Sequence, residues 1–210
     1  AGFNAFVLRY SVKPSVFPVA LLEAADAMTM IREHAAEWHV DPDAIAVIGF
    51  SAGGHLAANL ATSTSDDVLV AHGYDPDAVR PNGLMLAYPV ITSGPLAHRG
   101  SFDSLLGERR NDSQALESVS IERHIDAKTP PVFAWHTVPD ETVPYENTLM
   151  LIDACKKAGV SIEAHLFPQG GHGLSLGTAE TAWQGVNGIE PSIQIWPQLA
   201  VSWMRRTFAR

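Results

Sequence analysis

Gly49-Phe50-Ser51-Ala52-Gly53-Gly54-His55 is the stretch that decides the fold of this 210-residue chain. It reads G-x-S-x-G, follows an apolar run at residues 44–48 and precedes a helix-like run at residues 56–61. A strand, a sharp turn that presents a serine, and a helix are the context of a nucleophile elbow. Glycines two positions before and after Ser51 let the backbone turn where a Cβ would collide with its neighbours. The sequence therefore favours a reactive Ser51 over an ordinary strand-to-helix turn with an idle serine.

The rest of the chain alternates between strand-like and helix-like segments. The patterns predict strands at residues 5–12, 44–49, 83–88, 131–136 and 160–167. They predict helices at residues 19–39, 56–62, 101–106, 112–125, 145–158 and 196–208, and they leave residues 68–82 and 168–195 as loops. Such alternation is typical of βαβ units and a mainly parallel sheet. We expect one α/β domain over residues 1–210, with residues 92–129 forming a partial lid at the carboxyl edge of the sheet.

A serine hydroxyl is a weak nucleophile until a base takes its proton, and a third group must orient that base. With a nucleophile elbow, the acid and the histidine follow on later loops, in that order. Asp140 follows the strand expected at residues 131–136, and His172 lies between glycines after the last expected strand. We therefore predict that Asp140 orients His172 toward Ser51.

Other residues compete for these two roles. Glu141 is adjacent to Asp140 but is expected to point elsewhere, and a turn-forming role remains the alternative for Asp140. His34 and His39 fall on an expected helix, and His165 falls within an expected strand. His136 ends a strand, which leaves open whether it belongs to the core or supports the site.

The oxyanion of a tetrahedral intermediate needs about two hydrogen-bond donors. The backbone N–H of Ala52, the residue after the serine, is expected to be one of them. The second donor usually comes from a glycine-rich loop earlier in the chain, yet the only glycine before Gly49 is Gly2. The sequence thus predicts one donor and leaves the second unassigned.

Composition narrows the function further. The formal net charge of −9, with no basic run, argues against a nucleic-acid partner. No apolar run is long enough to cross a membrane, and no signal peptide is visible, so the expected location is cytoplasmic, although the chain does not begin with methionine.

The single cysteine, Cys155, excludes an intrachain disulfide. Neither a metal-binding motif nor a nucleotide-binding motif occurs, so no metal and no cofactor are expected. Two-carboxylate glycosidase chemistry stays open because it has no local signature.

Four stretches carry a resemblance to a known family: residues 48–58 (IGFSAGGHLAA), 101–107 (SFDSLLG), 129–147 (TPPVFAWHTVPDETVPYEN) and 167–174 (FPQGGHGL). They resemble the α/β-hydrolase superfamily, in particular its small bacterial acetyl-esterase and feruloyl-esterase-like (acetyl-xylan-esterase-type) branch. The resemblance implies that Ser51 is the nucleophile, His172 the base and Asp140 its orienting acid. It also implies a short-chain acyl ester substrate, often an acetyl group on a xylose-type sugar or oligosaccharide, and no cofactor.

The resemblance has one departure. It matches residues 5–12 to the fourth strand of the fold and residues 44–49 to the fifth, so the first three strands and the oxyanion loop have no counterpart in this sequence. Because that fold places its third strand between these two, we expect either a longer native polypeptide or another segment that fills the gap.

Two other functions remain as alternatives. One is a serine peptidase of the prolyl-oligopeptidase type, which shares the elbow and the order of the three residues. The other is a hydrolase scaffold that binds a ligand without catalysis. The sequence does not decide acyl length, and it leaves a homo-oligomer open.

Overall fold

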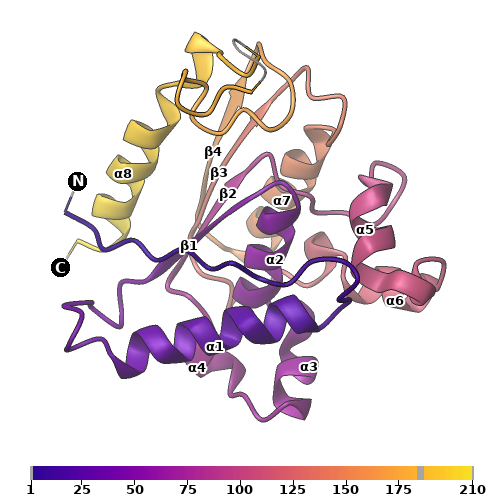
Figure 1. Cartoon of the computed structure of the whole chain (residues 1–210), viewed down its shortest axis with the longest axis vertical. Coiled ribbons are helices and arrows are strands. Elements are labelled where there is room, and N and C mark those ends of the chain that lie inside the picture. Colours follow the sequence, from indigo (N-terminus) through magenta and orange to yellow (C-terminus); the bar gives the residue numbers. More distant parts are fainter. Residues whose placement is uncertain (1, 184–186, 210) are drawn as a thin grey trace.

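Four strands in the described part of the chain form one parallel sheet. The computed structural model describes residues 2–183 and 187–209. Strands β1 (Ala46–Phe50), β2 (Gly83–Ala87), β3 (Val132–Thr137) and β4 (Ile162–Phe167) lie in the order β1-β2-β3-β4, and every neighbouring pair is parallel. The predicted mainly parallel sheet is therefore confirmed, and all four strands end at the same edge (Figure 1).

Alternating side chains of the two central strands build a core on each face of the sheet. Leu84 and Leu86 of β2 pack in the cluster that includes helices α2 (Ala52–Ala61) and α7 (Glu146–Ala158). Met85 and Ala87 belong to the opposite cluster, which contains helix α8 (Trp196–Thr207). Figure 1 shows α8 on one side of the strands and α2 and α7 on the other. Both central strands are buried along their whole length, as expected for parallel strands covered on both faces.

Helix α1 (Val19–Glu33) covers α2 from outside. Its buried residues Leu21, Ala25 and Met28 share a cluster with Leu60 of α2. The prediction that this helix reaches residue 39 is wrong, because the helix ends at Glu33. The chain then turns, and His39 has a positive φ of 54° that no right-handed helix accommodates.

Residues 68–82, which the sequence predicts to be loop-like, include most of the short helix α3 (Asp66–Ala71) and all of α4 (Pro76–Val79). Asp75 caps α4 by accepting a hydrogen bond from the N–H of Asp77, and Pro76 occupies the first turn. The prediction of a loop was wrong here because these helices are too short to show a hydrophobic period.

Residues 92–129 fold into short helices with a small core of their own. These helices are α5 (Arg99–Leu106), η2 (Gly107–Arg109), α6 (Ser113–Ser118) and η3 (Ile121–Arg123). Outside this segment, the short helix η1 (Ser63–Ser65) follows α2. Phe102, Ala115 and Val119 are buried together with Val143, which lies in the loop after β3. This segment is thereby attached to the loop that carries Asp140.

Residues 5–12 do not form the predicted strand. They run as an irregular segment in which the Val7 side chain is 94% exposed, and they make no ladder with β1. Local contacts hold them instead, since Glu23 of α1 accepts hydrogen bonds from the N–H and the hydroxyl of Ser11. An apolar β-rich run becomes a strand only where another strand pairs with it. Among the described residues β1 pairs with β2 alone. That a further segment pairs with the other side of β1 stays a prediction.

The last loop, at residues 168–195, contains the short helix η4 (Pro191–Ile193) before α8 begins. Part of this loop, residues 184–186, lies outside the described residues. Within the described ranges, no helix has the length and apolar character needed to cross a membrane.

Candidate active site

Ser51 lies on a tight turn between β1 and α2. Its backbone has φ 53° and ψ −120°, a region that non-glycine residues adopt only where the surrounding structure enforces it. The turn also brings two backbone segments into close contact, because a Cβ added at Gly49 would lie 2.2 Å from the carbonyl oxygen of Gly53. The predicted strand–turn–helix geometry is therefore present, and it depends on glycine at position 49.

The loop after β4 brings His172 to Ser51. The Oγ of Ser51 lies 2.7 Å from Nε2 of His172, within hydrogen-bond distance. Gly173, with φ +77°, provides a turn beside the histidine that other residues rarely adopt. The Thr137 hydroxyl donates to the carbonyl of Gly171 at 3.1 Å and ties the loop to the end of β3.

Asp140, in the loop after β3, completes the arrangement. Its Oδ2 accepts a hydrogen bond from Nδ1 of His172 at 2.7 Å, and its carboxylate is fully buried. Its Oδ1 accepts from the backbone N–H groups of Thr142 and Val143, at 2.9 Å each. Glu141, the adjacent competitor, is exposed. The structure thus brings together Ser51, His172 and Asp140, the three residues chosen from the sequence.

The surroundings of Asp140 keep its carboxylate charged. Burial alone would raise the pKa of this carboxyl. Hydrogen bonds from His136, His172 and the N–H of Val143, together with the charge of His172, outweigh burial and hold the pKa well below its usual range. A charged acceptor beside Nδ1 fixes the proton of neutral His172 on that nitrogen, which leaves Nε2 free to accept from the serine.

A second histidine contacts the same carboxylate. Nε2 of His136 lies 2.9 Å from the carbonyl oxygen of Val143 and 3.2 Å from Oδ2 of Asp140. Its Nδ1 lies 2.8 Å from the hydroxyl of Thr148 on α7. The sequence leaves the role of His136 open, and the structure places it, fully buried, within hydrogen-bond distance of the Asp140 carboxylate.

Tyr88, which follows β2 directly, was not identified from the sequence. Its ring meets the His172 ring edge-on, with centroids 5.0 Å apart, and its hydroxyl accepts a hydrogen bond from the N–H of Ser175 at 3.1 Å. Burial raises the pKa of Tyr88, and the charge of Asp140 acts in the same direction. The available signal was its position at the carboxyl end of a strand, directly before Pro89.

The predicted oxyanion donor lies at the start of α2. Ala52 is the first residue of this helix, so its N–H has no acceptor one turn earlier. The hydroxyl of Tyr10 lies beside the next residue of α2, because a Cβ added at Gly53 would lie 3.3 Å from the Tyr10 oxygen. Helix N-termini favour negative charge, which suits an oxyanion at this position.

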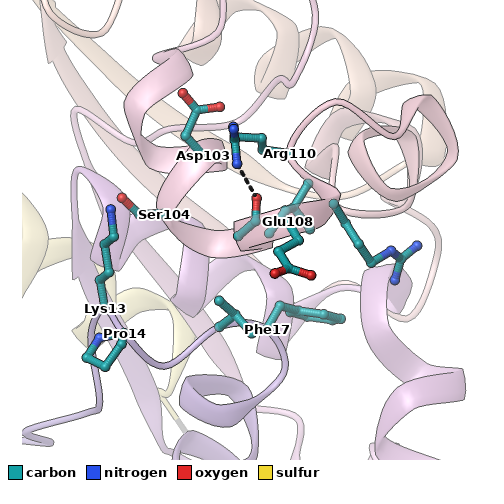
Figure 2. Close-up of a pocket in the computed structure, with 11 residues that line it drawn as sticks. Lys13, Pro14, Phe17, Asp103, Ser104, Glu108 and Arg110 are labelled. Atoms are coloured by element: carbon teal, nitrogen blue, oxygen red, sulfur yellow. Dashed lines mark hydrogen bonds between the residues drawn. The ribbon is translucent and has the colours of Figure 1, made fainter.

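A separate cavity of about 840 Å³ lies between the loop at residues 13–17 and the segment formed by α5 and η2. Figure 2 shows Lys13, Pro14, Asp103, Ser104 and Glu108 among the residues that line it. The residues that line it do not include Ser51, Asp140 or His172. Among the described residues, no group of three histidine, cysteine or acidic side chains is arranged to hold a metal ion.

Comparison with known proteins assigns the family. A family model described as BD-FAE matches residues 1–154, nearly three quarters of the chain. The chain belongs to the BD-FAE family. The matched range includes Ser51 and Asp140 and ends before His172.

Solved and curated relatives of the family agree with this assignment. The structure of an acetyl ester-xyloside bifunctional hydrolase from Caldicellulosiruptor lactoaceticus superposes with a TM-score of 0.80 at 36% identity, covering 95% of this chain and 70% of that one. The fold is that of an α/β-hydrolase, as predicted.

Two curated relatives are much longer than this chain. Endo-1,4-beta-xylanase B of Butyrivibrio fibrisolvens is 33% identical over 88% of this chain and 30% of its own length. Acetylxylan esterase of Xylanibacter ruminicola is 28% identical over 84% of this chain and 35% of its own length. The chain thus spans about a third of each of these proteins.

Proposed function

We propose that this chain is a serine carboxylesterase that hydrolyses short acyl esters through an acyl-enzyme. The observation that carries the proposal is the continuous hydrogen-bonded series from the Ser51 hydroxyl through His172 to the buried Asp140 carboxylate, with two contacts of 2.7 Å. This geometry supports the proposed roles of Ser51 as nucleophile, His172 as base and Asp140 as orienting acid in acyl transfer.

In the first half of the reaction, Ser51 Oγ attacks the ester carbonyl while Nε2 of His172 takes the hydroxyl proton. The resulting imidazolium is stabilised by the charge of Asp140. Negative charge develops on the carbonyl oxygen, and the N–H of Ala52 at the start of α2 donates to it. His172 then gives its proton to the leaving alcohol, the C–O bond breaks, and an acyl group remains on Ser51.

In the second half, a water molecule replaces the alcohol. His172 takes a proton from this water as its oxygen attacks the acyl carbon, and Ala52 again donates to the oxyanion. The tetrahedral intermediate collapses, His172 returns the proton to Ser51, and the carboxylic acid leaves. The cycle needs no group besides the protein and water.

The names of the relatives support the substrate class. One is an acetyl ester-xyloside hydrolase and another is an acetylxylan esterase. We therefore propose acetyl groups on xylose-type sugars or oligosaccharides as the substrate.

The test combines a covalent probe with two substrate classes. A fluorophosphonate is expected to label Ser51, and the protein is expected to hydrolyse p-nitrophenyl acetate and to release acetate from acetylated xylo-oligosaccharides. Ser51→Ala should abolish both labelling and hydrolysis. Preferential cleavage of proline amides would favour the peptidase alternative. A folded protein that binds acetylated sugars by calorimetry but is inert to the probe would favour the non-catalytic alternative.

A further inference from the structure

Asp140 lies in a loop, so its orientation depends on the groups that bond to its carboxylate. The loop between β3 and α7 belongs to neither a helix nor a strand at this position. Backbone N–H groups of the same loop hold Oδ1, whereas Oδ2 accepts only from two imidazoles, those of His172 and His136. His172 is the group that Asp140 must orient, and it lies on a glycine-flanked loop. The contact that can fix Oδ2 from a regular element is therefore the one with His136, on β3.

The hydrogen-bond partners of His136 define its tautomer. Nε2 faces two oxygens that only accept, the carbonyl of Val143 and the carboxylate of Asp140, so Nε2 must carry a hydrogen. Nδ1 faces the hydroxyl of Thr148 at 2.8 Å, and a hydroxyl can donate to an unprotonated ring nitrogen. Thr148, like His136, is fully buried, so water does not replace either contact.

We propose that His136 and Thr148 form a positioning pair that aligns Asp140 with His172. Thr148 on α7 donates to Nδ1 of His136 at the end of β3, and Nε2–H of His136 donates to the carboxylate oxygen that receives His172. The orientation of a loop carboxylate is thereby set by a strand and a helix, which are more rigid than the loop itself. The catalytic part of this inference rests on the proposed function.

The pair acts on the chemical step and not on substrate binding. His136 contacts Asp140, which bonds to Nδ1 of His172, whereas Ser51 lies at Nε2, the other nitrogen of that ring. Loss of its N–H lets the carboxylate rotate away from Nδ1 of His172 and leaves Val143 without its side-chain donor. Supporting residues of this kind change activity by about 10- to 100-fold in metal sites, and we expect a similar loss of kcat here, with KM changed less than about threefold.

Two substitutions of His136 separate positioning from packing. His136→Gln keeps an N–H toward Asp140 and an oxygen toward Thr148, whereas His136→Met keeps the volume and removes both bonds. We expect His136→Met to lose about 10- to 100-fold in kcat and His136→Gln to recover most of it. Leu151→Ala, one turn further along α7 in the core, is the matched control for lost stability. It should lower the unfolding temperature while keeping kcat per folded molecule.

Thr148 tests the second member of the pair. Thr148→Ser keeps the hydroxyl and should retain most of the activity, whereas Thr148→Val removes it and should lower kcat. Equal kcat values for Thr148→Ser and Thr148→Val would remove Thr148 from the proposal. Equal kcat values for His136→Met and His136→Gln would overturn it altogether.

A spectroscopic readout keeps this test separate from the proposed function. Long-range proton–nitrogen NMR spectra of the full chain should show His136 as the neutral tautomer protonated at Nε2. The low-field proton on Nδ1 of His172 should persist in His136→Gln and be lost in His136→Met. A His136 ring protonated at Nδ1 would refute the inference. If the wild-type chain neither labels at Ser51 nor cleaves p-nitrophenyl acetate, the proposed function fails, while the NMR result still decides how Asp140 is held.

Discussion

The hydroxyl of Ser51 and Nε2 of His172 lie 2.7 Å apart although the two residues are separated by 121 positions in the sequence. The contact forms because β1 and β4 run parallel in one sheet, so the turn after each strand lies at the same end of the sheet. His172→Ala removes the base, and we expect kcat/KM for p-nitrophenyl acetate to fall on the order of 10⁴-fold. Steady-state kinetics and the rate of fluorophosphonate labelling at Ser51 measure the effect. His165→Ala, which alters a histidine on β4 that bonds to Glu163, serves as control. Unchanged labelling in His172→Ala would assign the base to another residue.

Asp140→Asn is expected to keep the fold and to lose most of the activity. An amide can donate to Nδ1 of His172 and so favour the tautomer whose Nε2–H cannot accept the serine proton. The expected loss in kcat is on the order of 10⁴-fold. Glu141→Gln makes the same chemical change one residue later, on an exposed side chain, and should leave kcat within about twofold because surface changes have small effects. Comparable losses in both variants would contradict the assignment of the acid.

The glycines of the elbow are expected to differ in their tolerance of a methyl group. In Gly49→Ala the new Cβ would lie 2.2 Å from the backbone oxygen of Gly53, so the strand or the helix must move. We expect a loss of about 3 kcal/mol or more in the free energy of unfolding, at the upper end of the cost of overpacking.

Gly53→Ala provides the matched comparison. Its Cβ would meet only the Tyr10 hydroxyl, at 3.3 Å, which belongs to the end of a side chain. Alanine is also the better helix former, so stability should stay within about 1 kcal/mol of the wild type. Urea denaturation of both variants decides the matter, and equal stabilities would show that the elbow relaxes at Gly49.

The parts of this fold that could be predicted are those that local chemistry specifies. Gly49 and Ser51 mark the turn in any context, and the patterns around β2, β3, α2, α7 and α8 match elements whose burial is uniform or periodic. Asp140 and His172 could be chosen because a parallel sheet brings the loops after its strands to one edge. Chain order and topology together predict that the side chains of Ser51, Asp140 and His172 lie close to one another, and the structure brings them together.

The parts that could not be predicted depend on partners distant in the sequence. Residues 5–12 have the composition of a strand, but no strand pairs with them among the described residues, and Val7 is exposed. His136 is a histidine at a strand end, and only the folded loop shows that its Nε2 reaches Asp140. Tyr88 likewise reads in the sequence as the last residue of a buried strand, and only the folded structure shows that its ring packs against the ring of His172.

His55 on α2 is expected to make the stability of the protein depend on pH. Its Nε2 donates to the carbonyl of Val119 at 2.8 Å, and its Nδ1 faces the amide nitrogen of Asn59 at 3.0 Å, so a second ring proton would face a donor. Burial lowers the pKa of His55 to about 4 and outweighs the hydrogen bond to Val119, which acts in the opposite direction. Since the unfolded chain has a histidine pKa of about 6.5, it binds this proton first as the pH falls. The folded state should therefore be at full stability above about pH 6.5 and should lose about 3 kcal/mol as the pH falls to 4.

Urea denaturation at pH 7, 5.5 and 4 tests this pH dependence in the wild type and in His55→Gln, whose amide can still donate to Val119. The loss between pH 7 and pH 4 should be smaller in His55→Gln by about the contribution of one buried histidine, roughly 3 kcal/mol. The depressed pKa of Asp140 acts mainly below its unfolded value of about 3.9, and it is common to both proteins. His72→Gln alters an exposed histidine and should reproduce the wild-type pH dependence. The same loss of stability in all three proteins would mean that His55 accepts a proton in the folded state as readily as in the unfolded chain.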